Sequence, residues 1–368
     1  MKELTENNKR VDELDGLRGM AILAAVLYHY ANNLINADAS KFNLILKSIT
    51  HFFYTSIDMF FILSGFLLGG ILLQNKKSPH FFKTFYMRRI FRIVPLYLLL
   101  LIVVFIICTL GIGKGTAWWF NKEMPFWIYF TFLQNILMGI KDIMGNSWLS
   151  PTWSLGVEEQ FYLLISFLIY YSPKRVLIYI LIIGIICAPI FRYHAPTVYA
   201  LSTFTYCRFD ALFGGILIAI INQDESCNTF LKKYIAKFYF LTLLLLAVTF
   251  IFSIGKWHMP LFIVNSWFSI VYMLVLLLVI NDSKNIFSRL SRIKFFINLG
   301  LYSFSIYLFH EVILGLFFLT IPAKLPQINS LQDILMVLLC ALLTFYFARF
   351  MYLQFEKKFM KIGHFYKY

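Results

Sequence analysis

Residues 14–29, which read LDGLRGMAILAAVLYH, hold the most informative pattern in the chain. An apolar run lies here between Arg18 and His29, and with the residues that follow it makes a segment, 17–36, of about the 20 residues that a helix needs to cross a bilayer. The run lacks the small-residue cleavage site of a signal peptide, so the segment is predicted to remain in the protein as its first membrane span.

The composition of the 368 residues indicates that this span is one of many. Hydrophobic residues make up 60% of the chain and charged residues 14%, whereas charged residues supply about a quarter of an ordinary soluble domain. Apolar runs recur from about residue 17 to about residue 353, which leaves no room for a sizeable soluble domain. Five cysteines without a C-x-x-C spacing argue against a disulfide framework or a zinc site. These features predict a multi-spanning membrane protein.

Ten apolar segments have about the length of a span, so the predicted fold class is all-α: a polytopic integral membrane bundle of about ten transmembrane helices. The segments are 17–36, 52–73, 90–112, 154–171, 176–191, 208–222, 238–254, 261–280, 299–320 and 333–353. They divide the chain into a cytoplasmic N-terminal segment, 1–16, a membrane domain, 17–353, and a cytoplasmic basic tail, 354–368.

The basic residues predict the orientation. The chain carries 33 Lys and Arg against 18 Asp and Glu, and the excess gathers in alternate breaks between the spans. Because cytoplasmic loops are rich in Lys and Arg, ten spans place these breaks and both termini on the cytoplasmic side. If the short segment 127–140 also crossed the membrane, the basic breaks before it and after it would lie on opposite faces. This segment is therefore predicted to be re-entrant or interfacial, on the outer side. The abundance of Lys, Ile, Asn and Phe suits an AT-rich bacterial coding sequence, and the predicted location is the inner membrane of a bacterium.

Charged side chains at membrane depth cost roughly 2.5 to 3.5 kcal/mol each, so each is a candidate for function. Arg18 and His29 are close to three helical turns apart, which predicts that they share one face of the first span, about 16 Å apart along its axis. Arg89 and Arg92, with Arg88 beside them, lie at the cytoplasmic end of the third span. With Arg18 they are predicted to bind phosphate groups; anchoring to lipid headgroups is the alternative, above all for Arg88.

Acidic residues enter two other spans from the predicted outer side. Asp58 begins the second span, and Glu158 and Glu159 begin the fourth. With His29 they predict an acid–base cluster, although the same groups suit a proton or cation pathway. Asp58 alternatively caps a helix start, and Glu159 alternatively faces the headgroups, which leaves Glu158 as the stronger candidate.

Further polar residues lie in the sixth and ninth predicted spans. Ser303, Tyr307 and His310 share a helix face through spacings of four and three, and a hydroxyl that satisfies the histidine is the alternative to a role in chemistry. Arg208 and Asp210 are expected to pair with each other or to help bind an acceptor.

Six sequence blocks, taken in order, resemble the membrane acyltransferase-3 family. They are LDGLRGMAILAAVLYH (14–29), SIDMFFILSGFLL (56–68), RRIFRIVPLY (88–97), PTWSLGVEEQFYLL (151–164), RFDALFGG (208–215) and YSFSIYLFH (302–310). The resemblance covers nearly the whole chain, and the family's Arg-X10-His and Arg-X-X-Arg patterns fall on Arg18 with His29 and on Arg89 with Arg92.

The resemblance implies a membrane O-acyltransferase that moves an acyl group, commonly acetyl, from cytoplasmic acyl-CoA to a hydroxyl of a surface glycan or other acceptor at the outer face. It implies that Arg18, Arg89, Arg92 and Arg88 hold the phosphates of acetyl-CoA. His29 is then expected to act as the general base or to carry the acyl group itself.

The remaining assignments follow from the same resemblance. Glu158 or Asp58 is implied to orient the His29 ring. We expect no metal and no nucleic-acid partner. We expect the chain to lack the hydrolase-like domain that some relatives carry, and so to pass its acyl group to an acceptor directly or through a separate extracytoplasmic protein. The residues expected to contact the acceptor are Arg208, Tyr307, His310 and Trp153.

Two other functions remain open at this stage. An exporter of a lipid-linked or surface polysaccharide would use the buried charges as a translocation path, although the sequence does not show the paired broken helices of many transporters. A structural subunit of a polysaccharide synthase would need no arginine and histidine in phase on one helix.

Overall fold

The computed structural model describes residues 12–112, 123–254, 260–319 and 327–368. Within these ranges the chain is helical apart from short connections, and the pairing of Ile35 with Ile328 is an isolated bridge rather than part of a strand. The all-α fold class is confirmed.

Ten long helices each contain most of one predicted segment. They are α2 (Asp12–Leu27), α4 (Ser56–Asn75), α5 (Phe81–Thr109), α8 (Trp153–Tyr171), α9 (Lys174–Tyr193), α11 (Phe209–Asn222), α13 (Ile235–Ile254), α14 (Leu261–Asn281), α17 (Ser303–Leu319) and α18 (Leu331–Met351). The shorter helices are α3 (Lys41–His51), α6 (Trp127–Phe130), α7 (Gln134–Lys141), α10 (Ala200–Thr203), α12 (Glu225–Lys233), α15 (Ile286–Ser291), α16 (Lys294–Leu301) and α19 (Lys357–Gly363). Single π or 3-10 turns flank several of them, among them the π-helical turn η1 (Tyr28–Asn32) and the 3-10 turn η5 (Thr205–Arg208).

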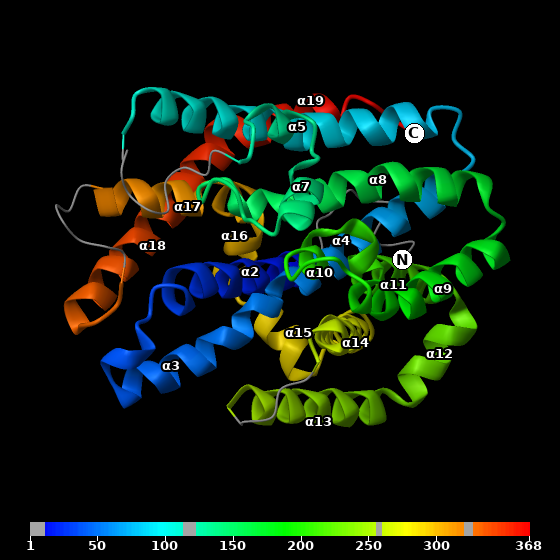
Figure 1. The fold of residues 1–368 in the computed structure, drawn as a ribbon. Coiled ribbons are helices and arrows are strands. Elements are labelled where there is room, and N and C mark those ends of the chain that lie inside the picture. Colours follow the sequence, from blue (N-terminus) through cyan, green and yellow to red (C-terminus); the bar gives the residue numbers. More distant parts are fainter. Residues whose placement is uncertain (1–11, 113–122, 255–259, 320–326) are drawn as a thin grey trace.

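The helices form one bundle, in which α5 and α13 lie on opposite sides and α2, α4 and α11 lie between them (Figure 1). Among the described residues, six helical segments are long and apolar enough to cross a membrane, or up to eight if each of two bent helix pairs is one span. This number is lower than the predicted ten. Helices α2 and α8, which carry the ionisable residues of the first and fourth predicted spans, are not among the six.

Two predicted segments are broken in the structure. The segment 299–320 is not one helix, because α16 and α17 meet at an angle of 75°. Helix α16 instead packs against α2 so closely that a Cβ on Gly300 would lie 1.8 Å from the carbonyl oxygen of Asp15. The segment 127–140 forms α6 and α7, which Phe132 separates with a φ of 55°. Both helices are far shorter than the roughly 20 residues of a crossing.

The central contact of the bundle is between α4 and α11, where two glycines meet. A Cβ on Gly65 would lie 2.1 Å from the carbonyl oxygen of Leu212, and a Cβ on Gly215 would lie 2.2 Å from that of Ile62. Small residues let membrane helices approach this closely, and here they bring Asp58 of α4 near the start of α11.

Replacing Gly65 with alanine is therefore expected to force the two helices apart and to destabilise the protein by about 1–3 kcal/mol. Gly69→Ala, one turn along the same helix, is the matched control, because its Cβ would meet the Ile216 side chain at 3.0 Å and no backbone atom closer than 3.3 Å. Thermal denaturation in detergent should give a clearly lower midpoint for Gly65→Ala than for Gly69→Ala. Equal midpoints would contradict the close backbone contact.

Candidate active site

The first span changes its helical geometry where the predicted histidine lies. Helix α2 ends at Leu27 and continues as the π-helical turn η1, a feature common at functional sites. This turn carries His29, whose Nδ1 lies 2.7 Å from Oε1 of Glu311 on α17. The carboxylate side chain is only 10% exposed and that of the histidine 25%. Because a carboxylate accepts, Nδ1 of His29 donates the hydrogen bond, and Nε2 is left with a lone pair.

A second histidine lies directly behind this pair. The ring centroids of His29 and His310 are 5.0 Å apart, and Nε2 of His310 lies 3.9 Å from Oε1 of Glu311. The tautomer of His310 follows from its other nitrogen, because Nδ1 lies 2.9 Å from the carbonyl oxygen of Tyr307 and must donate to it. Nε2 is buried, and in the described part of the chain it has no hydrogen-bond partner.

A cavity of about 510 Å³ opens beside the His29–Glu311 pair. It is walled by aromatic rings and by short polar side chains, a composition typical of ligand sites. The lining residues are Tyr28, His29, Asn33, Leu34, Met144, Ser147, Ser150, Pro151, Trp153, Tyr199, Glu311 and Leu314. Of the residues predicted to contact an acceptor, Trp153 lines this cavity, whereas His310 is not among the lining residues.

Three of the four predicted phosphate-binding arginines interact with Glu158. Arg92, Arg89 and Arg18 all interact electrostatically with the Glu158 carboxylate, which also accepts a 2.7 Å hydrogen bond from the hydroxyl of Tyr162. The carboxylate that contacts His29 is therefore not Glu158, one of the two expected from the sequence, but Glu311 of α17.

The individual arginines differ in the hydrogen bonds that they already make within the protein. Nε of Arg89 is buried and lacks a hydrogen-bond partner among the described residues, while its guanidinium carbon lies 5.9 Å from the centroid of the Tyr162 ring. Arg88 instead donates from Nε to the carbonyl oxygen of Tyr366 at 3.0 Å and lies over the ring of Tyr368. Arg18 donates to Asp15 at 3.1 Å. Arg89 therefore offers the clearest unused donor, and Arg88 is occupied by the C-terminal segment.

Tyr307 interacts both with the wall of the cavity and with the carboxylate near the arginines. Its hydroxyl donates to the carbonyl oxygen of Pro151, which lines the cavity, at 2.7 Å, and lies 3.0 Å from Oγ of Ser154. Tyr307 also interacts electrostatically with Glu158. No arginine is among the described residues that line the cavity.

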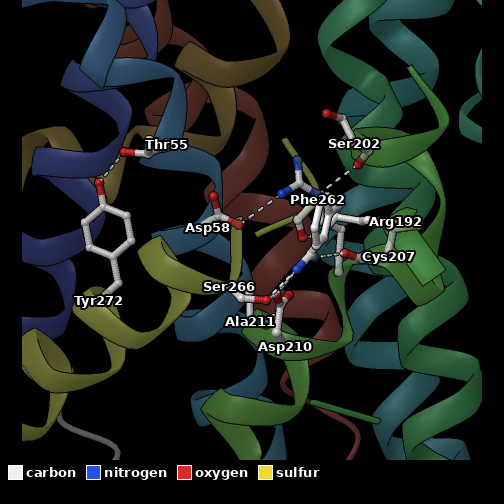
Figure 2. A network of polar contacts seen from close by, with 11 residues as sticks. Thr55, Asp58, Arg192, Ser202, Cys207, Asp210, Ala211, Phe262, Ser266 and Tyr272 are labelled. Atoms are coloured by element: carbon white, nitrogen blue, oxygen red, sulfur yellow. Dashed lines mark hydrogen bonds and ion pairs between the residues drawn. The ribbon is translucent and has the colours of Figure 1, made fainter. Parts of the chain in front are cut away.

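Four buried charges form a separate network at the junction of α4, α9 and α11 (Figure 2). Arg208 pairs with Asp58 at 3.1 Å, and Arg192 pairs with Asp210 at 2.7 Å. The expected pairing of Arg208 with Asp210 is therefore wrong, because each has a partner on another helix. Asp58 is fully buried in this network, so it does not orient the His29 ring. Arg208 also lies 5.6 Å from the ring of Trp153 and supports that wall of the cavity.

Two residues that the structure brings into these clusters had no role predicted from the sequence, namely Glu311 and Arg192. Glu311 follows directly after the last quoted block, and two adjacent ionisable residues within an apolar span were the available signal. Arg192 lies at the end of the fifth predicted span, where it looked like a loop residue. Neither partner could be assigned without the fold.

The fold and the site together define a polytopic helical membrane protein with a histidine–carboxylate pair at a ligand-sized cavity. A family model described as an acyltransferase domain matches residues 11–353, which is most of the chain. The chain therefore belongs to this family, the membrane acyltransferase-3 family.

Relatives with names of their own match parts of the chain. The peptidoglycan O-acetyltransferase OatA of Listeria monocytogenes is 28% identical over 205 residues, which are 51% of this chain and 30% of that protein. The putative peptidoglycan O-acetyltransferase YrhL of Bacillus subtilis is 30% identical over 173 residues, 45% of this chain and 24% of that protein. The chain thus spans less than a third of either relative. No solved structure matches the chain.

The buried network is expected to stabilise the fold rather than to take part in chemistry. Arg192→Met should leave the Asp210 carboxylate buried without its counter-ion and lower the free energy of unfolding by about 3–5 kcal/mol. Arg175→Met, an exposed position on the same helix, should change it little. Heating of both variants in detergent measures the difference, and an unchanged melting midpoint for Arg192→Met would contradict the structural role.

Proposed function

We propose that the protein is an inner-membrane O-acetyltransferase that moves an acetyl group from cytoplasmic acetyl-CoA to a hydroxyl group of a surface glycan at the outer face. The observation that carries the proposal is the His29–Glu311 pair in the wall of a cavity, together with a group of arginines that interact with Glu158. The named relatives, both described as peptidoglycan O-acetyltransferases, support the choice of acetyl group and glycan.

In this proposal His29 is the general base. Glu311 holds the proton on Nδ1, so Nε2 can accept the proton of the acceptor hydroxyl while its oxygen attacks the thioester carbonyl. The new ester bond forms as the carbon–sulfur bond breaks, and the imidazolium returns its proton to the departing CoA thiolate. The carboxylate stabilises the imidazolium in between, as the acidic member of a catalytic triad does.

The donor would bind through its phosphates to the arginines. Arg89 has a buried Nε without a hydrogen-bond partner in the described residues, and Arg92 and Arg18 interact with the same carboxylate, Glu158. Phosphate oxygens would supply the acceptors that these guanidinium groups need, with charge-assisted bonds. The pantetheine arm would then have to displace the Tyr307 hydroxyl from Pro151 to bring the thioester to His29.

The acceptor would occupy the cavity. Tyr28, Trp153 and Tyr199 present aromatic rings, against which the apolar faces of sugars pack, and Asn33 and Ser147 offer hydrogen bonds to hydroxyl groups. A volume of about 510 Å³ suits a short stretch of glycan rather than a folded protein. An exporter remains the alternative, but it gives no reason for a histidine–carboxylate pair in the cavity wall.

Substitution of the pair tests the proposal. His29→Ala and Glu311→Gln are each expected to lower acetyl transfer by about 100-fold or more, and because the two residues act as one unit, the double variant should be little worse than the single ones. Mass spectrometry of envelope glycans from cells with each variant measures the transfer. Glu225→Gln, an exposed carboxylate, is the control. Normal acetylation with His29→Ala at normal protein levels would exclude the base role.

The arginines are expected to act on donor binding alone. Arg89→Ala and Arg92→Ala should each raise the KM for acetyl-CoA about 10- to 100-fold, because each loses charge-assisted hydrogen bonds, while the KM for the acceptor stays similar. Arg88→Ala should have a smaller effect, since this side chain contacts the C-terminal segment. Lys83→Ala, exposed on the same helix, controls for the loss of one positive charge. An unchanged donor KM would exclude the phosphate site.

A further inference from the structure

Three side chains that can coordinate a metal ion meet at the wall of the cavity. One ligand atom from each of His29, His310 and Glu311 lies within 4.8 Å of the other two. We propose that these residues form a binding site for a divalent transition-metal ion of the zinc type. Two imidazoles, one carboxylate and an open fourth position are a ligand set found in zinc sites, whereas magnesium and calcium prefer oxygen ligands.

The hydrogen bonds that Nδ1 of His310 makes leave its Nε2 able to bind a metal ion. Its Nδ1 donates to the carbonyl oxygen of Tyr307, which leaves the Nε2 lone pair free. Metal-binding histidines commonly hold their second nitrogen in this way, because the bond fixes both the tautomer and the ring orientation. Nε2 is otherwise a buried polar atom without a hydrogen-bond partner among the described residues, and His310 is only 2% exposed. A coordinated ion would satisfy it.

The spacing requires only small adjustments. Zinc–ligand bonds of 2.0–2.1 Å place neighbouring ligand atoms of a tetrahedral site about 3.3 Å apart. Nδ1 of His29 and Oε1 of Glu311 are 2.7 Å apart and would separate slightly, while Nε2 of His310 is 3.9 Å from Oε1 and would approach it. The ligand nitrogens of the two histidines, which lie within 4.8 Å of each other, would also approach.

The site is also accessible and suitably charged. His29 and Glu311 both line the cavity, so an ion can enter through the space in which the acceptor is proposed to bind. The Glu311 carboxylate offsets part of the charge of the ion, and a water molecule from the cavity can fill the fourth position.

Metal binding has a consequence for the reaction, and this consequence rests on the proposed function. Coordination through Nδ1 of His29 moves the proton of that nitrogen to Nε2, so the ring presents an N–H group to the acceptor and can no longer accept its proton. An ion at this site should therefore inhibit acetyl transfer, and a chelator should restore it.

Cobalt provides the direct test, because tetrahedral Co²⁺ absorbs visible light much more strongly than the octahedral aqueous ion. The full-length protein in detergent is titrated with Co²⁺, and a tetrahedral spectrum that Zn²⁺ abolishes is the expected result. His310→Gln and Glu311→Gln should each weaken Co²⁺ binding by at least about tenfold. His51→Gln, outside the cluster, is the control and should leave the binding unchanged.

His310→Cys separates coordination from a purely structural role. A thiolate at this position should restore the site and add a sulfur-to-cobalt charge-transfer band, which no change in packing can produce. An octahedral spectrum in the wild-type protein, or unchanged binding in a well-folded His310→Gln variant, would overturn the proposal. If Co²⁺ or Zn²⁺ occupies the site while acetyl transfer continues, the metal site stands and the base role of His29 fails.

Discussion

A charge buried among apolar helices is stable only with a partner, and this constraint organises the bundle. Arg208 reaches across from the start of α11 to Asp58 on α4, and Arg192 reaches from α9 to Asp210. Each pair links two helices, and the close contact of α4 with α11 holds the four charges together. Removal of one member would leave an unpaired charge, which is far more costly than a lost surface contact. The position of the cavity wall depends on this network through the contact of Arg208 with Trp153.

Paired charges also form the two parts of the candidate site. At one end the histidine–carboxylate pair borders a cavity with aromatic walls, and elsewhere three arginines interact electrostatically with one carboxylate, Glu158. Tyr307 interacts with both, through a hydrogen bond to Pro151 in the cavity wall and electrostatically with Glu158. In the proposed reaction a polar donor stays at the arginine end while its thioester passes the tyrosine. This arrangement would keep the two substrates on opposite sides of the tyrosine until transfer.

The sequence was sufficient to locate the long helices, but not to predict which helices and which charged residues contact one another. Apolar length located ten segments, and each of the ten long helices contains most of one of them, because hydrophobicity is a local property. The break between α16 and α17 was missed, since Gly300 packs closely against Asp15 there and no local pattern records that contact. The ion pairs were missed for the same reason: Asp58 and Arg208 are 150 positions apart. A charged residue inside a span indicates that it has a partner, but the sequence does not show which residue that partner is.

The central claim is that donor and acceptor meet from opposite faces of the membrane. Sealed membrane vesicles of both orientations, given acetyl-CoA with a labelled acetyl group on the outside only, test it directly. The account predicts that glycan acetylation occurs in inside-out vesicles, where the arginine end faces the added donor, and that the label appears on glycan inside the vesicle. Equal labelling in right-side-out vesicles would contradict it, because the donor would then reach the histidine from the acceptor side.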